Sequence, residues 1–235
     1  VEGGNITYTA SVTNPTGTAL VVTLSNGSSI TIPAGQSSGN VSVAAPSDDV
    51  YIDAGSVTVS VTGTSGGNYE NLQNGSISAT TAITDDSDST TLNLTGTASV
   101  VEGGSIVYSA SLTNPTGTAL TITLSNGAVI NIAANASTGS VTVAAPSDDA
   151  VIDAGSVSVT VASTSGGNYE QLTVGTGSAG NPVITTVTDD ADSTTLSLTA
   201  SASVVEGGNI TYTASVNNPT GTALVVTLSN GSSIT

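Results

Sequence analysis

Residues 101–124 read VEGGSIVYSASLTNPTGTALTITL, and this stretch decides the fold because apolar and polar side chains alternate along it. The alternation covers 106–112 and again 120–124, which places the apolar side chains on one face of an extended chain. Between these runs, residues 114–117 read Asn-Pro-Thr-Gly, a composition typical of turns. The stretch therefore predicts two β-strands joined by a turn, each with one buried face.

The same period-two pattern extends over residues 89–192 and predicts seven strands, with no window of helical periodicity. The predicted strands are a first one from Leu92 to near Val100, then 106–112, 120–124, 129–132, 141–143, 157–161 and 183–187. Seven short strands in about 100 residues are typical of an antiparallel immunoglobulin-like β-sandwich. The predicted fold class is all-β, with a lean core that contains one tyrosine per repeat: Tyr8, Tyr108 and Tyr212.

The sequence repeats itself with a period near 100 residues. Residues 1–72 and 101–172 are identical at 50 of 72 positions, and residues 205–235 match 1–31 at 30 of 31 positions. This period is too long for a solenoid repeat of about 20–50 residues and suits a whole domain. The second period is four residues longer than the first, and the addition falls around Thr176–Pro182.

We therefore expect tandem seven-stranded immunoglobulin-like β-sandwich domains in a linear array. Residues 1–88 are predicted to form a repeat that lacks its first strand, 89–192 a complete repeat, and 193–235 a partial repeat. These three parts are called the first, second and third repeat below. Because the chain starts and stops partway through a repeat, we expect it to be a piece of a longer array.

The composition excludes several classes of function. Lys, Arg, His, Cys, Met, Trp and Phe are all absent, and 17 Asp and Glu give a net charge of −17. Without a basic patch, nucleic acid is not an expected partner. Without cysteine, histidine and lysine there is no disulfide framework, no zinc site with those ligands and none of the commonest general bases. No apolar run approaches the roughly 18 residues of a membrane span, so we expect no signal peptide or membrane insertion in this segment.

The positions of the carboxylates carry the most information. All 17 acids follow one pattern of eight per repeat, and Glu206 opens the third repeat. In the first repeat they are Glu2, Asp48, Asp49, Asp53, Glu70, Asp85, Asp86 and Asp88. In the second repeat they are Glu102, Asp148, Asp149, Asp153, Glu170, Asp189, Asp190 and Asp192.

Alternating strand directions predict where these acids meet. The connections that hold Glu102 and 148–153 share one end of the sandwich with residues 189–192, which follow the last strand. Seven of the eight carboxylates should therefore converge at the pole where the chain leaves for the next domain. Glu170 lies at the opposite pole, which faces the previous domain in a head-to-tail array, so it should approach 85–88.

Seven carboxylates at one pole cannot form salt bridges in a chain that has no cationic side chain. Either the pole opens and hydrates, or it binds cations. Oxygen ligands from several loops suit Ca²⁺, which takes about 6–8 oxygens in flexible geometry, better than Mg²⁺ or a soft metal. The alternative is that these are solvated residues that favour turns. We predict Ca²⁺ sites built from all of these acids except Glu70.

Several motifs recur in order along the chain. They are the Glu-Gly-Gly turn, Asn-Pro-Thr-Gly-Thr, Ala-Pro-Ser-Asp-Asp with a further Asp four positions on, Gly-Gly-Asn-Tyr-Glu, and a closing Asp-Asp-x-Asp. The set resembles Calx-β and related calcium-binding immunoglobulin-like domains. It is most similar to extender repeats of giant biofilm adhesins that Gram-negative bacteria secrete by the type I route, the RTX adhesins.

This resemblance implies a fold, a cofactor and a role. In such adhesins, tandem sandwiches with Ca²⁺ between domains form a stiff stalk that holds ligand-binding domains away from the cell. The chain is therefore expected to be a structural spacer on a bacterial cell surface or outside the cell. Its expected partners are the neighbouring repeats and other components of the fibre or biofilm matrix.

Other functions fit the sequence less well. A module that binds carbohydrate, ice or a host surface could use threonine-rich strand faces such as Thr7–Thr9, but exposed threonine on strands usually reflects strand propensity. An enzyme could use a carboxylate pair such as Asp148 and Asp149. Neighbouring acids on one loop rarely flank a substrate from two sides, so we expect no enzyme. A fibre polymerised from short subunits by strand exchange remains an alternative.

Overall fold

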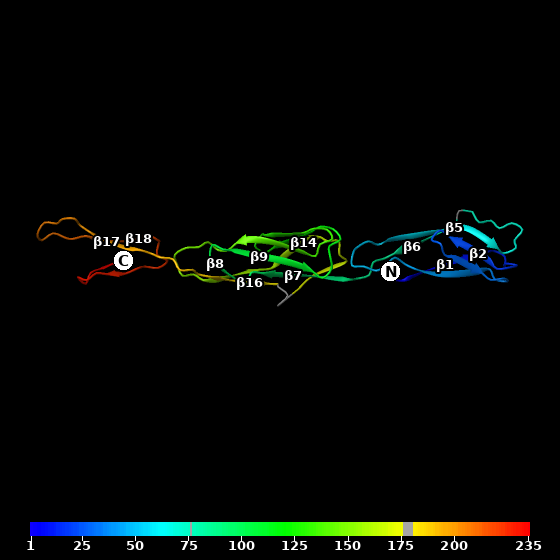
Figure 1. The fold of residues 1–235 in the computed structure, drawn as a ribbon, viewed down its shortest axis with the longest axis horizontal. Coiled ribbons are helices and arrows are strands. Elements are labelled where there is room, and N and C mark those ends of the chain that lie inside the picture. The colour runs from blue at the N-terminus through cyan, green and yellow to red at the C-terminus, as the bar shows by residue number, and fades with distance from the viewer. Residues whose placement is uncertain (76, 176–180) are drawn as a thin grey trace.

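The computed structural model describes residues 1–75, 77–175 and 181–235, and these residues form a row of β-structure with no helix (Figure 1). This confirms the all-β expectation. The first repeat contains β1 (Asn5–Ser11), β2 (Leu20–Leu24), β3 (Ser29–Ile32), β4 (Ser38–Ala44), β5 (Gly55–Gly66) and β6 (Ser78–Ile83).

The second repeat is the most complete of the three. Its strands are β7 (Ser89–Gly96), β8 (Ser99–Val101), β9 (Ser105–Leu112), β10 (Leu120–Leu124), β11 (Val129–Ile132), β12 (Thr138–Ala144), β13 (Gly155–Val159), β14 (Val161–Gly166), β15 (Gln171–Val174) and β16 (Val183–Thr188). Most of the predicted addition around Thr176–Pro182 lies outside the described residues.

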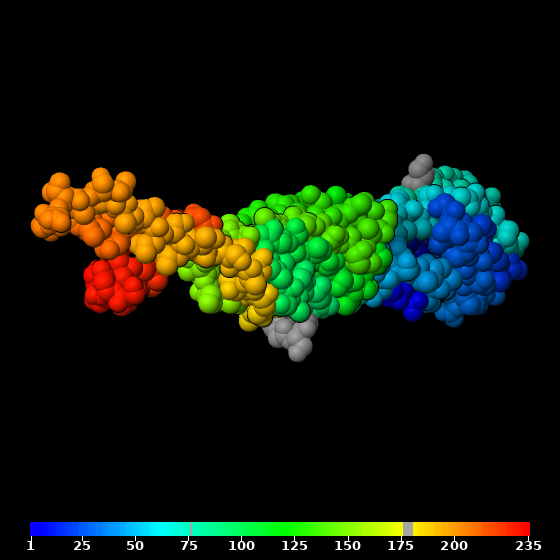
Figure 2. Space-filling view, turned by 60° about the vertical axis from the view of Figure 1, so that its left-hand side comes forward, coloured from blue at the N-terminus to red at the C-terminus, as the bar shows by residue number. Residues whose placement is uncertain are grey.

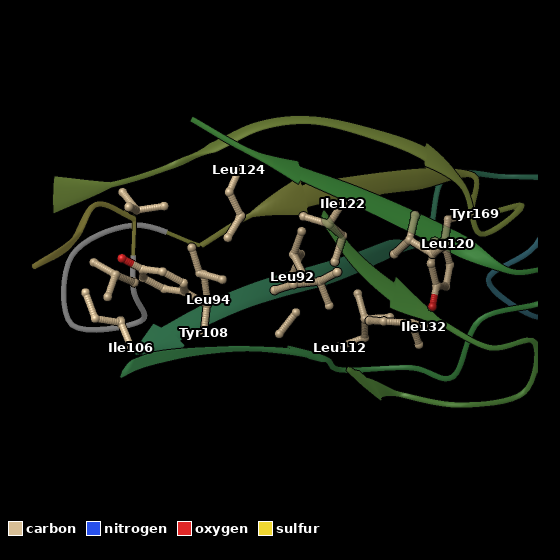
Figure 3. Packing of buried hydrophobic residues seen from close by; sticks show 14 of the residues in the cluster. Leu92, Leu94, Ile106, Tyr108, Leu112, Leu120, Ile122, Leu124, Ile132 and Tyr169 are labelled. Atoms are coloured by element: carbon tan, nitrogen blue, oxygen red, sulfur yellow. The ribbon is translucent and has the colours of Figure 1, made fainter. Parts of the chain in front are cut away.

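The second repeat is a sandwich of two layers. One layer is the sheet β12-β9-β7-β15, and the other consists of β11-β10-β14 and β13-β16-β8. Strand β9 shows why the sequence folds this way, because its side chains alternate between buried and outward positions along 105–112. The buried side chains of both layers meet in one apolar core, with the fully buried Tyr108 toward one end and Tyr169 toward the other (Figure 3).

The expected seven strands are correct in position, but two of them are interrupted. The predicted first strand is divided into β7 and β8 because the chain changes layers near Gly96: β7 pairs with β9, whereas β8 pairs in parallel with β16. The predicted sixth strand is divided into β13 and β14 at Thr160, beside a register shift between Thr123 and Leu124 of β10. The corresponding strand of the first repeat, β5, is continuous.

Strand β15 was not expected from the sequence. It pairs in parallel with β7 and follows Tyr169, which is a second buried tyrosine of this repeat. A strand of four residues with apolar side chains only at Leu172 and Val174 gives too short an alternation to be recognised.

The third repeat contains β17 (Leu196–Ala200), β18 (Tyr212–Val216), β19 (Val226–Thr227) and β20 (Ser233–Ile234). These strands form only two pairs, β17-β18 and β19-β20, and Figure 2 shows them as a thin extension beyond the second repeat. In this partial repeat the side chain of Tyr212 is half-buried, whereas the equivalent Tyr8 and Tyr108 are buried.

Candidate metal centres at the domain junction

Twelve carboxylates gather at the poles of the first two repeats and form four groups of three. Within each group the ligand oxygens lie within 4.8 Å of one another. We name the groups by composition. The Glu triads are Glu2, Asp53, Asp85 and Glu102, Asp153, Asp189, and the Asp triads are Asp48, Asp86, Asp88 and Asp148, Asp190, Asp192.

The Glu-Gly-Gly turn before β9 positions Glu102. The backbone N–H of Glu102 donates to the carbonyl of Thr188 at 3.1 Å, which fixes the turn beside the residues that follow β16. Gly103 has a φ of 67°, in the left-handed region that favours glycine. A Cβ at Gly103 would lie 3.1 Å from the Cβ of Asp148, so glycine also lets the turn approach the Asp triad. The first repeat has the same turn.

An Asp-Asp pair lies in the loop before β5 and in the loop before β13, and its two aspartates have different roles. Asp48 and Asp148 belong to the Asp triads. In contrast, Oδ1 of Asp49 accepts a hydrogen bond from the backbone N–H of Tyr51 at 2.8 Å, and Oδ1 of Asp149 accepts one from Val151 at 2.7 Å. These second aspartates therefore shape the loop that presents the triads.

The glutamate of each Glu triad has a raised pKa. Burial, then a hydrogen bond and charge repulsion from Asp53, raise the pKa of Glu2 from 4.5 to about 7. For Glu102 the hydrogen bond with Asp153 is the largest cause, followed by burial, and its pKa is also raised to about 7. Near neutral pH these glutamates thus favour either a proton or a cation.

The Asp triads show the same effect. Burial, followed by the charges of Asp86 and Asp88, raises the pKa of Asp48. The charge of Asp190 is the largest cause of the raised pKa of Asp148, and burial adds to it. Repulsion between like charges therefore acts in every triad.

Several of these oxygens are buried without a hydrogen-bond partner. Glu2 and Glu102 are each only 8% exposed, and Oε2 of each has no partner. Oxygen atoms within 4.8 Å of one another are close enough to share one ion at calcium–oxygen distances of about 2.4 Å. An all-oxygen donor set with unpartnered, buried carboxylate atoms fits Ca²⁺.

The second repeat reaches back to the acidic pole of the first repeat through Glu170. The backbone N–H of Asp88 donates to Oε2 of Glu170 at 2.6 Å, and the backbone N–H of Glu170 donates to the carbonyl of Val50 at 3.1 Å. Oε1 of Glu170 is buried without a partner. The structure thus brings a carboxylate of one repeat against the Asp triad of the preceding repeat.

Aromatic and backbone contacts join the same two repeats. Tyr51 stacks on Tyr169 with ring centroids 5.8 Å apart, and its hydroxyl donates to the carbonyl of Pro115 at 2.7 Å. The backbone N–H of Ile52 donates to the carbonyl of Asn168 at 3.0 Å, and the Asn168 side chain donates back to the carbonyl of Ile52 at 3.1 Å. Burial raises the pKa of Tyr169 to about 12. Direct contacts therefore orient the second repeat on the first.

The family model of the LapA domain matches residues 1–86, 88–190 and 192–235. The chain belongs to the LapA-domain family. LapA is a large biofilm adhesin, and the match makes this chain an adhesin-related repeat protein. Comparison with curated proteins gives no match.

Membership of the LapA-domain family indicates a cell-surface or extracellular protein with a structural rather than an enzymatic role. Within residues 1–75, 77–175 and 181–235, no helix has the length and apolar character that a membrane span requires.

The sequence-predicted ligands of this LapA-domain chain fall into four classes of position. Twelve of the sixteen lie in the triads, and Glu170 lies at the junction. Asp49 and Asp149 accept backbone hydrogen bonds and lie outside the triads. Glu206 is exposed and belongs to no triad in the described part of the chain. Coordination of Ca²⁺ by these residues remains a prediction.

The uncharged residues that join the two repeats were not predicted from the sequence. Tyr51, Ile52 and Asn168 all contact the neighbouring repeat. One signal was present, because Tyr51 replaces the valine that the second repeat has at position 151, among otherwise similar residues. The positive φ of Asn168, 58°, belongs to the Gly-Gly-Asn turn that the sequence did mark.

Proposed function

We propose that this chain is a structural extender of an extracellular adhesin or surface fibre, made rigid by Ca²⁺ at its domain junctions. One observation carries the proposal: the triads lie at the pole that Glu170 of the following repeat contacts. An ion held there would share ligands between two domains and so limit their relative motion.

The triads and the contact residues at the junction would have different roles. The Glu triad would hold one ion with carboxylates of its own repeat, while the Asp triad would hold another beside the free Oε1 of Glu170. When bound, Ca²⁺ supplies positive charge that offsets the repulsion among the carboxylates. Tyr51 and Asn168 set the direction in which the second repeat leaves the first, and the triads then determine whether that direction is held.

The recurring sequence motifs support a more specific family relationship. We propose kinship with Calx-β-type domains and with the extender repeats of RTX adhesins that Gram-negative bacteria secrete. In that setting calcium is plentiful outside the cell, so the array would stiffen after export. Neighbouring repeats of the same chain are the proposed partners, together with other components of the fibre or biofilm matrix.

A distance measurement across the first junction tests the proposal. The chain has no cysteine, so Thr31→Cys and Ser140→Cys place one spin label on an exposed position of each repeat. We expect a narrow distance distribution by pulsed electron paramagnetic resonance in Ca²⁺ and a broad one after the metal is removed. Mg²⁺ at the same concentration should not restore the narrow distribution.

A label pair within one repeat provides the matched control. Labels at Ser140 and Ser158 lie on two exposed strand positions of the second repeat and should give the same distribution in both conditions. Identical distributions across the junction with and without Ca²⁺ would show that the ion does not rigidify the array.

A further inference from the structure

In the second repeat, the segment by which the chain enters and the strand by which it leaves lie side by side. The chain enters from the first repeat at Ser89, runs through β7 into β8, and leaves from the end of β16 toward the third repeat. Strands β8 and β16 are parallel neighbours, with Ser99 opposite Thr186 and Val101 opposite Thr188. A pull along the chain therefore reaches β8 from one side of this pair and β16 from the other.

The directions of the two strands determine how such a pull acts on them. In Figure 1 the repeats form a row, and β8 lies at the end of the second repeat that is remote from the first repeat. Tension pulls β8 toward the first repeat from its N-terminal end, and it pulls β16 toward the third repeat from its C-terminal end. Because the strands are parallel, these are opposite ends of the pair, so the strands must slide past each other instead of peeling apart. Sliding stretches all hydrogen bonds of the pair at the same time.

Side-chain hydrogen bonds reinforce the pair. The hydroxyl of Thr185 donates to the carbonyl of Thr97 at 2.7 Å, and the hydroxyl of Thr188 donates to the carbonyl of Val100 at 3.3 Å. Thr185 is 0% exposed, so water cannot take over its bond before the strands move. The two threonines thus add bonds between β16 and the segment around β8 that the backbone ladder alone does not supply.

The pairing of β8 with β16 breaks whichever end of the repeat detaches first. Departure of β7 and β8 separates them from β9, β15 and β16, whereas departure of β16 separates it from β13 and β8. Only the β8–β16 pair is common to both routes. Backbone N–H groups of Thr186 and Glu102 also donate across it, to the carbonyls of Ala98 at 2.9 Å and of Thr188 at 3.1 Å. Resistance to tension is therefore concentrated in residues 97–102 and 185–188.

We propose that β8 and β16 form a mechanical clamp that keeps the second repeat folded when the array is under tension. This function goes beyond that of a spacer, because a spacer sets a distance, whereas the clamp sets the tension at which the fibre lengthens by unfolding. Forced unfolding is governed by the barrier and not by the equilibrium stability. The clamp depends on pairing within one repeat and does not rest on the proposed role of calcium.

Two buried threonines provide a matched test. Thr185 and Thr116 are both 0% exposed, and each hydroxyl donates to a backbone carbonyl at 2.7 Å, that of Thr97 and that of Ala133 respectively. Thr116 lies between β9 and β10, and Ala133 follows β11, so their bond lies outside β7, β8 and β16. Replacement by valine removes one buried hydroxyl bond in each case and keeps the branched shape of the side chain.

Optical tweezers that stretch the 235-residue chain from its two ends, without metal, measure the effect. Thr185→Val should raise the rate at which the second repeat unfolds at fixed tension about tenfold, whereas Thr116→Val should leave it within about twofold. Both variants should lower the melting temperature without tension by similar amounts, so equilibrium stability does not account for the difference. Equal rates under tension in the two variants, or no change in Thr185→Val, would overturn the clamp.

A disulfide identifies the unfolding event of the second repeat. Ser99 and Thr186 are exposed partners on neighbouring strands of a chain that has no cysteine, so Ser99→Cys and Thr186→Cys can be joined by oxidation. The event that belongs to this repeat should lose most of its released length under oxidation, because residues 99–186 stay linked, and should regain it in reductant.

The direction of the pull gives a second test that leaves every hydrogen bond of the clamp in place. Handles on Val101→Cys and Ala191→Cys pull at adjacent ends of β8 and β16, so the bonds of the pair break one after another. The second repeat should unfold at a lower force in this direction than when the chain is pulled from its two ends at the same loading rate. Equal forces in the two directions would show that the pair does not act as a clamp.

Discussion

Replacement of Glu102 by glutamine is expected to change the stability of the second repeat in opposite directions with and without calcium. Glu102 is 8% exposed, its Oε2 has no partner, and its pKa is raised to about 7. Above pH 7 the metal-free fold therefore holds a charge that the unfolded chain accommodates more easily. Glutamine removes this charge, so the melting temperature without metal should rise.

With calcium the sign reverses, because the same substitution removes a charged ligand from the Glu triad. A site at a hundredfold excess of ligand over its dissociation constant stabilises a fold by about 2.7 kcal/mol, or roughly 10–20 °C in a domain of this size. A tenfold weaker site at the same calcium concentration loses about 1.4 kcal/mol, or roughly 6–11 °C. The part of the calcium-dependent rise in melting temperature that comes from the Asp triad should remain.

Scanning calorimetry at pH 8 measures the change in melting temperature, first on protein freed of metal and then in excess calcium. Glu70→Gln is the matched control, since Glu70 is exposed and lies outside the triads, and it should leave the calcium-dependent shift unchanged. If Glu102→Gln lowered the melting temperature equally in both conditions, Glu102 would be a structural residue of the turn and the metal assignment of its triad would fail.

Three further predictions concern pH, the junction and the core. The raised pKa values of Glu2 and Glu102 mean that their contribution to metal-free stability is complete below about pH 4.5 and is lost as the pH rises through 7, so calorimetry on resin-treated protein should show a falling melting temperature from pH 5 to 8. In saturating calcium the trend should reverse, because protons compete with the ion. Tyr51→Val should broaden the distance distribution across the first junction, most clearly without metal, since the ring stack and the hydroxyl hydrogen bond are lost; an unchanged width would contradict the role given to Tyr51. Leu92→Ala should cost about 2–5 kcal/mol in denaturant unfolding of the second repeat, whereas Ile184→Ala, at an exposed side chain of the same repeat, should cost far less.

Period-two alternation was sufficient to predict the strands because each sandwich strand has one buried face. Strand β9 lies within one residue of its predicted bounds for this reason. The break after Gly96 could not be predicted, because it depends on the pairing of β8 with β16, which lies far along the chain. Strand β15 was missed because pairing with β7, rather than its own short pattern, makes it a strand.

The sequence predicted which pole of the sandwich holds the acids, but it did not predict how they group there. Strand directions correctly brought the acids that follow β16 to the loops that hold Glu102 and Asp148. Which of two adjacent aspartates joins a triad could not be read from the sequence. Asp148 and Asp149 have the same chemistry, and only the structure shows that Asp148 belongs to the Asp triad while Oδ1 of Asp149 accepts a hydrogen bond from Val151.

The two junctions of this chain carry different side chains at one contact position, Tyr51 and Val151, and the difference has a mechanical consequence. A Cβ at Gly117 would lie 3.0 Å from the ring of Tyr51, and a Cβ at Gly221 would lie 2.9 Å from Cγ1 of Val151, so the Asn-Pro-Thr-Gly turn leaves room for this side chain at both junctions. Tyrosine adds a ring stack and a hydroxyl donor, whereas valine supplies only an apolar contact. A junction with valine must therefore rely more on its carboxylates and their cations to hold two domains in line. Stiffness along the array should vary with this residue in low calcium and become uniform when the triads are filled.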